Sequence, residues 1–313
     1  MEKKKILLLC GGEGPEHDIS LISAKYIESV IAAEPKFALT KIELKKDTYG
    51  PSFFEQLKSF DYIIPCIHGF PGETGDIQSI FEILNLPYLG AGSEASKICF
   101  NKISTKLWLA GQKIPVTPYV FIQSLKDSKK VFKFFQKHPR LFIKPSSQGS
   151  SVGCTLVTRE DQIENALAEA LKFSPYALVE KGLKARELEV AVFEFKNKVR
   201  VTSPGEVIIT KCQDAFYSYK EKYDPTSKAY TEVMAQNLDP KIAKKIMLYS
   251  KKAFKALNIK HLSRIDFFLT EDGKIYLNEI NTFPGMTPIS MFPKMMENSG
   301  TPFRNFLLEK ING

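Results

Sequence analysis

The sequence has few cysteines and no long apolar run, and both absences exclude whole classes of protein. None of its apolar runs approaches the roughly 20 residues that a membrane-spanning helix needs. The run from Ile6 to Cys10 is also shorter than the core of about 7–15 residues in a signal peptide. The five cysteines are widely spaced, odd in number and without a CxxC pair, which argues against a disulfide framework or a zinc knuckle. We therefore expect a cytoplasmic protein that makes no use of a membrane.

The sequence also lacks any signature of a nucleic-acid-binding module, although its formal net charge is +9. Such a charge suits nucleic acid, a membrane surface or anionic small substrates. The densest basic run, Lys126 to Arg140, has apolar residues at helical spacing (Val131, Phe134 and Phe135). This pattern predicts an amphipathic surface helix with solvated lysines rather than a platform for bases.

What is present is enough for a packed core in two or three domains: 313 residues with 43% hydrophobic content. The first 90 or so residues alternate strand and helix patterns, which predicts a parallel sheet covered by helices. The predicted elements are strands at 6–10, 37–44 and 62–67 and helices at 19–33 and 77–84. A smaller unit follows, with strands at 141–144, 154–157 and 177–180. A third, β-rich unit holds one long helix near 240–257 and a hairpin.

The hairpin, "RIDFFLTEDGKIYLNEIN" (264–281), carries the first candidate site. A two-residue turn at Asp272-Gly273 would place Asp266 opposite Glu279 and Arg264 opposite Asn281, all on one face. A three-residue loop would shift this register. Facing carboxylates repel each other, so their pairing needs a reason. One reason is a bound Mg²⁺ or Mn²⁺ ion, which prefers hard oxygen ligands. The alternative is a solvated acidic face balanced by Arg264. The following loop, "TFPGMTPIS", is rich in glycine, proline and hydroxyls and favours a binding site.

Two glycine-rich loops follow strands of the predicted parallel sheet, at the edge where ligands bind. The first, "GGEGPEHDIS" (11–20), is not a GxGxxG dinucleotide loop. Its Glu16 either complements the dipole of the next helix or holds a substrate ammonium. The second, "HGFPGETGDIQ" (68–78), begins with His68, which is either a structural histidine or part of a site.

Three further stretches point to a nucleotide. "FIKPSSQGSSVG" (142–153) places Lys144 before a small-residue loop that could cradle phosphate, although it is not a Walker loop and could be a flexible hairpin loop. Glu180 and Glu187 lie at strand ends, where carboxylates could accept from adenine and ribose. "FYSYKEKY" (216–223) is either a solvated loop or an active-site flap.

Taken in order, these stretches resemble the D-alanine–D-alanine ligases of the ATP-grasp superfamily. Each match is modest alone, but six in the family's order between residues 11 and 293 are highly specific. The matching stretches are "GG…EHDIS", "HG…GETGDIQ", "IKPSSQGSSVG", "ARELEV", "FYSYKEKY" and "RIDFF…LNEINTFPGMTPIS". Four positions depart from the usual family pattern: Asn101, Cys154, Ser218 and the pair Lys260-His261.

The resemblance implies an α/β, three-domain ATP-grasp fold with nucleotide bound between the second and third domains. The implied domains are an N-terminal, Rossmann-like substrate-binding domain (1–93), a central domain (94–183) and a C-terminal catalytic domain (184–313). It also implies an ADP-forming reaction. ATP phosphorylates the carboxylate of one D-alanine, and the amine of a second D-alanine attacks the acyl phosphate. The dipeptide product serves peptidoglycan synthesis, and the enzyme is expected to be a homodimer.

Roles for individual residues follow from the resemblance. The implied ligands of two Mg²⁺ (or Mn²⁺) ions are Asp266, Glu279 and Asn281. The implied phosphate-binding residues are Lys102, Lys144 and Lys222. The implied adenine- and ribose-binding residues are Glu180, Lys181, Leu183 and Glu187.

The substrate residues are implied in the same way. Glu16 would pair with the first ammonium, with Ser150 and Tyr223 bonded around it. Arg264 and the Gly285 N–H would stabilise the tetrahedral oxyanion. The residues implied to contact substrate elsewhere are His68, Ser290 and Met291. The rivals to this reading are a ligase of the same fold that makes D-alanine–D-lactate or D-alanine–D-serine, and a non-enzymatic nucleotide- or nucleic-acid-binding protein.

Overall fold

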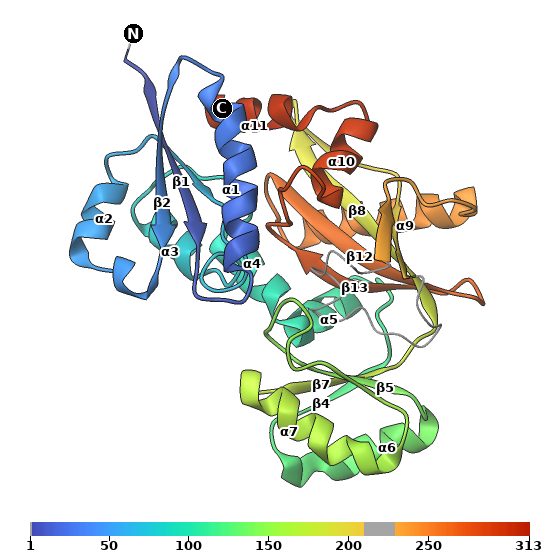
Figure 1. Ribbon diagram of the computed structural model, residues 1–313. Coiled ribbons are helices and arrows are strands. Elements are labelled where there is room, and N and C mark those ends of the chain that lie inside the picture. Colours follow the sequence, from blue (N-terminus) through green and yellow to red (C-terminus); the bar gives the residue numbers. More distant parts are fainter. Residues whose placement is uncertain (1, 210–228) are drawn as a thin grey trace.

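The computed structural model describes residues 2–209 and 229–313, which fold around three β-sheets (Figure 1). The first sheet is parallel, in the order β2-β1-β3. Its strands are β1 (Lys4–Gly11), β2 (Phe37–Leu44) and β3 (Tyr62–Pro65). The helical elements of this unit are α1 (His17–Ala32), the 3₁₀ turn η1 (Lys46–Thr48), α2 (Pro51–Leu57) and α3 (Asp76–Ile83). The predicted parallel sheet is therefore confirmed.

The continuous apolar run of β1 is explained by burial on both faces of its sheet. Ile6 and Leu8 face a core shared with α1 and with the C-terminal helices α10 (Met291–Asn298) and α11 (Phe303–Asn312). Leu7 and Leu9 face a second core formed with α2 and α3. The shared core joins the two ends of the chain, and α1 and α11 lie side by side (Figure 1).

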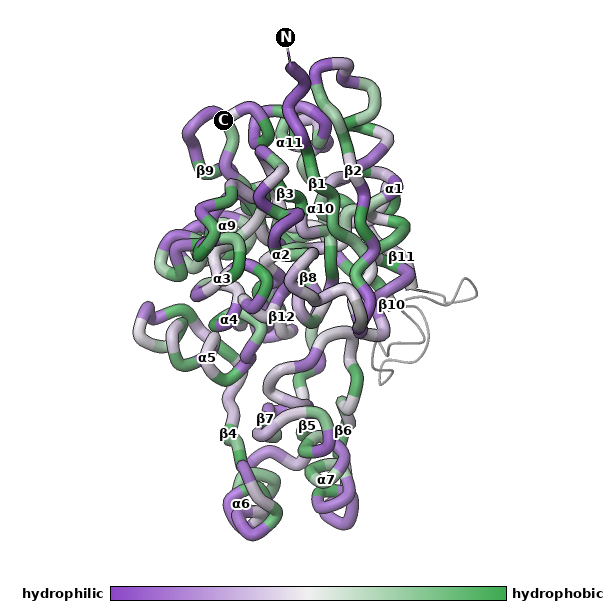
Figure 2. Tube along the Cα trace, turned by 90° about the vertical axis from the view of Figure 1, so that its left-hand side faces the viewer, coloured by the Kyte–Doolittle hydropathy of each residue, from purple (hydrophilic) through white to green (hydrophobic). Residues whose placement is uncertain are grey.

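The second sheet is antiparallel, in the order β4-β7-β5-β6, and forms the lower end of the molecule in both views (Figures 1 and 2). Its strands are β4 (Tyr119–Ile122), β5 (Leu141–Pro145), β6 (Thr155–Val157) and β7 (Ala177–Lys181). Its helical elements are η2 (Leu125–Asp127), α6 (Ser128–Lys137), η3 (Glu160–Gln162) and α7 (Ile163–Phe173). In α6, Val131 is buried and Phe134 and Phe135 pack beside it, while the lysines are exposed. The predicted amphipathic surface helix is confirmed.

The third sheet has the order β11-β10-β8-β12-β13, with β9 paired to β8, among the described residues. Its strands are β8 (Ala185–Phe195), β9 (Lys198–Val201), β10 (Gly205–Ile209), β11 (Ala229–Glu232), β12 (Leu262–Thr270) and β13 (Ile275–Asn281). The long helix α9 (Pro240–Ala256) covers one face through Ile246, Ala253 and Phe254.

Two helices between the first and second sheets pack with the third sheet. They are α4 (Ser93–Phe100) and α5 (Lys102–Gly111), and their buried residues share a core with Leu277 and Ile280 of β13. The Asn101 side chain caps α5, accepting from the N–H groups of Ile103 (3.1 Å) and Ser104 (3.0 Å). Asparagine is among the residues preferred at this N-cap position. The domain limits at residues 93 and 183 stay a prediction.

The two strands of the hairpin pair as predicted, but the turn between them is longer than predicted. Asp266 faces Glu279 and Arg264 faces Asn281. The loop, however, has three residues, 271–273: the Gly273 N–H donates to the Thr270 carbonyl (2.9 Å), and Gly273 adopts a φ of +76°. A β-bulge at Asn278 then shifts the register by one residue and restores the predicted pairs. The two-residue turn was wrong, and the predicted pairs hold only because the bulge offsets the extra loop residue.

Two sequence exclusions have direct structural counterparts. No helix in residues 2–209 and 229–313 is long and apolar enough to cross a membrane. Cys10, Cys66 and Cys99 are buried and Cys154 is half-buried, and none of these four cysteines forms a disulfide.

Candidate active site

A cavity of about 980 Å³ is lined by strands of the second and third sheets, by α1 and α5, and by loops of all three units. Every predicted site residue that the structure describes lines it. These residues are Glu16, His68, Lys102, Lys144, Ser150, Glu180, Lys181, Leu183, Glu187, Arg264, Asp266, Glu279, Asn281, Gly285, Ser290 and Met291. Two predicted site residues, Lys222 and Tyr223, lie outside the described residues, as does Ser218.

Three carboxylates form a row across the floor of this cavity. Strand pairing places Glu189 of β8 opposite Asp266 of β12, and Asp266 opposite Glu279 of β13. Arg264 donates to both Asp266 oxygens (2.8 Å each), and its Nε lies 3.3 Å from Glu189. Burial alone would lower the pKa of Arg264, but these carboxylates raise it well above its usual range. Glu189 was missed, although the spacing of Glu187 and Glu189 in "ARELEV" already put both on one face of a strand.

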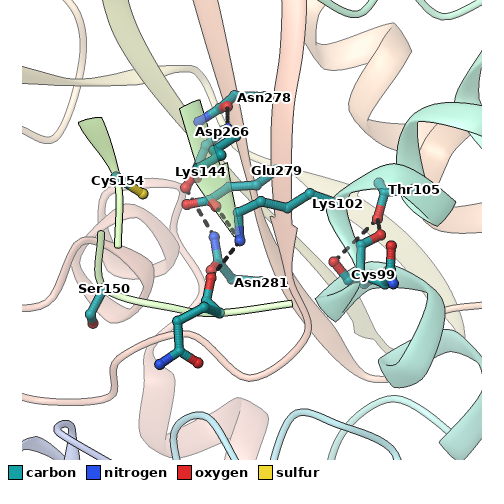
Figure 3. A network of polar contacts seen from close by, with 12 residues as sticks. Cys99, Lys102, Thr105, Lys144, Ser150, Cys154, Asp266, Asn278, Glu279 and Asn281 are labelled. Carbon is teal, nitrogen blue, oxygen red and sulfur yellow. Dashed lines mark hydrogen bonds and ion pairs between the residues drawn. The ribbon is translucent and has the colours of Figure 1, made fainter. Parts of the chain in front are cut away.

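Oxygen atoms that could bind a hard metal ion lie beside this row. Asn281 donates through Nδ2 to Asp266 (2.9 Å), which brings its amide next to that carboxylate. Lys102 reaches toward Glu279 from α5, with 3.6 Å between Nζ and Oε2, and also donates to the Gln148 carbonyl (2.8 Å; Figure 3). Two carboxylates and an amide oxygen suit Mg²⁺ or Mn²⁺. These candidate ligands are two carboxylates and one amide. No group of three or more His, Cys, Asp and Glu side chains in the described part of the chain could hold a metal.

A buried cluster of charges lies where β5, β7 and α5 meet. Glu180 is 2% exposed and contacts two lysines, Lys106 and Lys144, one through each carboxylate oxygen. The Lys144 Nζ lies 2.6 Å from Glu180 and also donates to Oδ1 of Asn278, the bulge residue, at 3.4 Å. Burial raises the pKa of Glu180, but the two lysines lower it to about 2. Sequence reasoning missed Lys106, because a lysine one helical turn after Lys102 reads as a solvated residue.

Glu16 faces the cavity from the start of α1. Its side chain makes no capping bond to that helix and instead accepts a hydrogen bond from the Ser150 hydroxyl. The loop that carries Ser150 is conformationally unusual, since Ser150 and Ser151 have φ values of +49° and +61°. Non-glycine residues rarely adopt this region, and those that do cluster at functional sites.

One buried group and one half-buried group lie close enough to Glu16 to be affected by its charge. His68 is 5% exposed, and its Nε2 lies 3.4 Å from the Ser23 hydroxyl. Burial lowers the pKa of His68, which favours the neutral ring. Glu73 accepts from the Gly69 N–H (2.8 Å), and burial, reinforced by the nearby Glu16 charge, raises its pKa to about 8. Glu73 was not singled out from the sequence, although it stands in the "GETGD" stretch.

The loop after β13 closes the remaining side of the cavity. Ser290 precedes the first residue of α10, Met291, and its Oγ accepts from the Thr287 N–H (3.0 Å). The first amides of a helix lack acceptors within the helix and favour an anion. This end of the cavity therefore suits a carboxylate.

Comparisons with known proteins agree on one family. The sequence model described as "D-ala D-ala ligase C-terminus" matches residues 108–312. A D-alanine–D-alanine ligase from Shewanella frigidimarina is 49% identical over 333 aligned positions, covering 99% of this chain and 98% of the relative. The chain belongs to the D-alanine–D-alanine ligase family.

Solved structures of this family share the whole fold. D-alanyl-alanine synthetase A from Vibrio cholerae superposes with a TM-score of 0.90 at 45% identity, over 100% of this chain and 98% of that one. VanG D-Ala:D-Ser ligase from Enterococcus faecalis gives 0.83 at 26% identity, over 99% of both chains. The predicted three-domain ATP-grasp fold is confirmed by these ligases.

Proposed function

We propose that this enzyme joins two molecules of D-alanine into D-alanyl-D-alanine, with ATP converted to ADP and phosphate. One observation carries the proposal: a cavity built from three units brings an ammonium partner (Glu16), phosphate-side lysines and Arg264 together. End-to-end identity to D-alanine–D-alanine ligases, 49% in one case, supports the same reaction.

ATP enters this cavity as a substrate. Lys102 and Lys144 neutralise phosphate oxygens, which are the anions that buried ammonium groups prefer. The side chains proposed for adenine and ribose lie at the end of β7, in the turn after it and near the start of β8. They are Glu180, Lys181, Leu183 and Glu187. Lys222 keeps its predicted role as a further phosphate ligand.

Two Mg²⁺ or Mn²⁺ ions are proposed beside the middle of β12 and the end of β13. Asp266, Glu279 and Asn281 fit them, since their oxygens are hard and adjacent. Such ions would supply positive charge that neutralises the phosphates and the transferred group. A bound cation would explain why the hairpin places two carboxylates opposite each other.

The first step places one D-alanine beside Glu16. Its ammonium pairs with that carboxylate, and Ser150 and Tyr223 complete the hydrogen bonds around it. A carboxylate oxygen of D-alanine attacks the γ-phosphorus, the bond to the ADP oxygen breaks, and an acyl phosphate forms. Binding the reactants in line contributes most of the rate enhancement in such transfers.

The second step joins the two amino acids. Ser290 and the Met291 N–H hold the carboxylate of the second D-alanine, and its amine attacks the acyl carbon. Arg264 and the Gly285 N–H stabilise the oxyanion that develops, a contribution larger in the transition state than in the ground state. Phosphate leaves with one former carboxylate oxygen, and the new amide nitrogen loses a proton. His68, buried and neutral, lies beside the first substrate.

The remaining predictions concern surroundings and partners. A cytoplasmic location, a homodimer and the absence of nucleic-acid and membrane partners stay predictions. The dipeptide serves peptidoglycan synthesis, as it does for the family.

The test is turnover of the purified chain with ATP, Mg²⁺ and D-alanine. ADP is followed by a coupled assay and the product by chiral chromatography with mass spectrometry. D-serine, D-lactate and L-alanine are offered as competing second substrates. The proposal expects D-alanyl-D-alanine as the main product and one ADP per dipeptide. Preferential formation of a D-serine or D-lactate product would overturn it, as would ATP binding without ligation.

A further inference from the structure

Lys106 is a buried cation that the proposed reaction does not use. It lies on α5 one turn after Lys102, so both project from the same side of the helix. Only 1% of Lys106 is exposed, and its ammonium contacts Glu180. The other oxygen of Glu180 contacts Lys144, which is 4% exposed. Two buried ammonium groups thus share one carboxylate.

Burying these charges costs free energy, because each charged group loses its hydration, so the arrangement needs an explanation. A single lysine would neutralise Glu180, whereas two leave one net positive charge on the cluster. A second cation is therefore more than neutralisation of Glu180 requires in the nucleotide-free state. Burial also lowers the pKa of Lys106, against the opposing effect of Glu180.

The second cation becomes useful when nucleotide binds. When Lys144 also donates to a phosphate oxygen, that anion competes with Glu180 for the positive charge of the ammonium, which weakens the 2.6 Å contact. Without Lys106, Glu180 would then remain as a buried carboxylate with only this weakened contact, which is unfavourable. With Lys106 in place, Glu180 stays paired while Lys144 is shared.

We propose that Lys106 is a positioning residue that keeps Glu180 paired, so that Lys144 can be shared with the phosphates of ATP. The inference rests on the proposed function, since it assumes that ATP binds at Lys144. Asn278 assists, because its side-chain oxygen accepts from Lys144 (3.4 Å) without holding it by charge.

The test compares Lys106→Met with the wild type in the full chain. Methionine preserves length and apolar bulk but removes the charge. Calorimetric titration with ATP and Mg²⁺, without D-alanine, gives the dissociation constant. We expect a rise of roughly tenfold or more, a parallel rise in KM for ATP, and little change in KM for D-alanine. The melting temperature should fall little, because Glu180 keeps Lys144 in the free enzyme.

Two further variants serve as controls. Lys106→Arg retains a cation and should recover part of the affinity. Lys97→Met removes an exposed lysine from the neighbouring helix α4, away from the cavity, and should change neither affinity nor melting temperature. If Lys97→Met lost as much ATP affinity as Lys106→Met, the loss would be explained by the net charge of the protein alone. That result would overturn the inference.

A thermodynamic cycle with Glu180→Gln separates pairing from simple attraction between Lys106 and ATP. If Lys106 acts through Glu180, then Lys106→Met should weaken ATP binding less than about threefold in the Glu180→Gln background. A loss of equal size in both backgrounds would contradict the inference. An unchanged dissociation constant in a folded Lys106→Met would also contradict it. Wild-type chain that binds no ATP would instead refute the proposed function.

Discussion

Replacing Glu279 by glutamine removes one charge from the proposed metal site while preserving shape. Glu279 lies opposite Asp266, its side chain is 26% exposed, and its Oε2 is 3.6 Å from the Lys102 ammonium. Asp266 is itself flanked on its other side by Glu189. The substitution therefore takes one negative charge from a row of three.

The two consequences differ in size. A partly exposed ion pair such as Glu279–Lys102 contributes about 0–1 kcal/mol to stability, and relief of repulsion between facing carboxylates recovers a similar amount. The free energy of unfolding should therefore change by less than about 1 kcal/mol. Turnover should fall at least roughly 10²-fold, the scale for losing one electrostatic stabiliser of a transition state, about 2.7–4 kcal/mol.

The assay pairs ADP release at saturating ATP, D-alanine and Mg²⁺ with urea unfolding. Binding of Mn²⁺, measured by its paramagnetic signal, gives a readout independent of turnover and should weaken. Glu271→Gln, in the exposed loop of the same hairpin, is the matched control and should leave turnover unchanged. Near-normal turnover and Mn²⁺ binding in Glu279→Gln would remove Glu279 from the metal site.

Three further predictions concern other parts of the cavity. Arg264→Lys keeps the charge but loses the planar guanidinium that contacts both Asp266 oxygens. Turnover should fall at least about 10²-fold, while the ATP dissociation constant should change less than about threefold. Equal losses in turnover and in ATP affinity would indicate a phosphate-binding or structural role. Glu73 has a folded-state pKa of about 8 against an ordinary value of 4.5, so the folded state binds more protons in this interval and wild-type stability should fall as pH rises from about 4.5 to 8. Glu73→Gln should lose that part of the pH dependence, which urea unfolding at pH 5.5 and 8.5 measures; identical slopes in both proteins would refute the assignment. Gly72→Ala would place a Cβ against the Ile67 carbonyl oxygen and should destabilise the fold by at least about 1–3 kcal/mol in thermal unfolding. Gly111→Ala is the control and should not destabilise the fold, because its added Cβ would have no neighbouring atom within 4 Å. An unchanged melting temperature in Gly72→Ala would show that this loop relaxes freely.

The elements that are strongly periodic in sequence were predictable. The strand at Phe37–Leu44 and the helix at Pro240–Ala256 follow from apolar spacing, because burial on one or two faces imposes that spacing. The pairing of Asp266 with Glu279 was also predicted correctly, but two deviations had cancelled. A three-residue loop moved the register by one position, and the bulge at Asn278 moved it back. Local sequence carries no clear mark of a bulge.

Residues that act through partners distant in sequence were not predictable. Lys106 resembles any solvated helix lysine until β7 brings Glu180 against it. Glu189 acquires its place beside Arg264 only through the pairing of β8 with β12. Glu73 owes its raised pKa to burial and to the charge of Glu16, which lies in another loop. Such residues depend on tertiary contacts, whereas the predicted site residues stood in stretches that already resembled the family.

The central claim is that an acyl phosphate links ATP to peptide-bond formation in this cavity. The most direct measurement uses D-alanine labelled with ¹⁸O in both carboxylate oxygens, together with unlabelled ATP and Mg²⁺. Mass spectrometry follows the label in the released phosphate. Because the leaving phosphate takes one former carboxylate oxygen, each dipeptide should yield one phosphate containing a single ¹⁸O. Dipeptide formed with unlabelled phosphate would contradict the account.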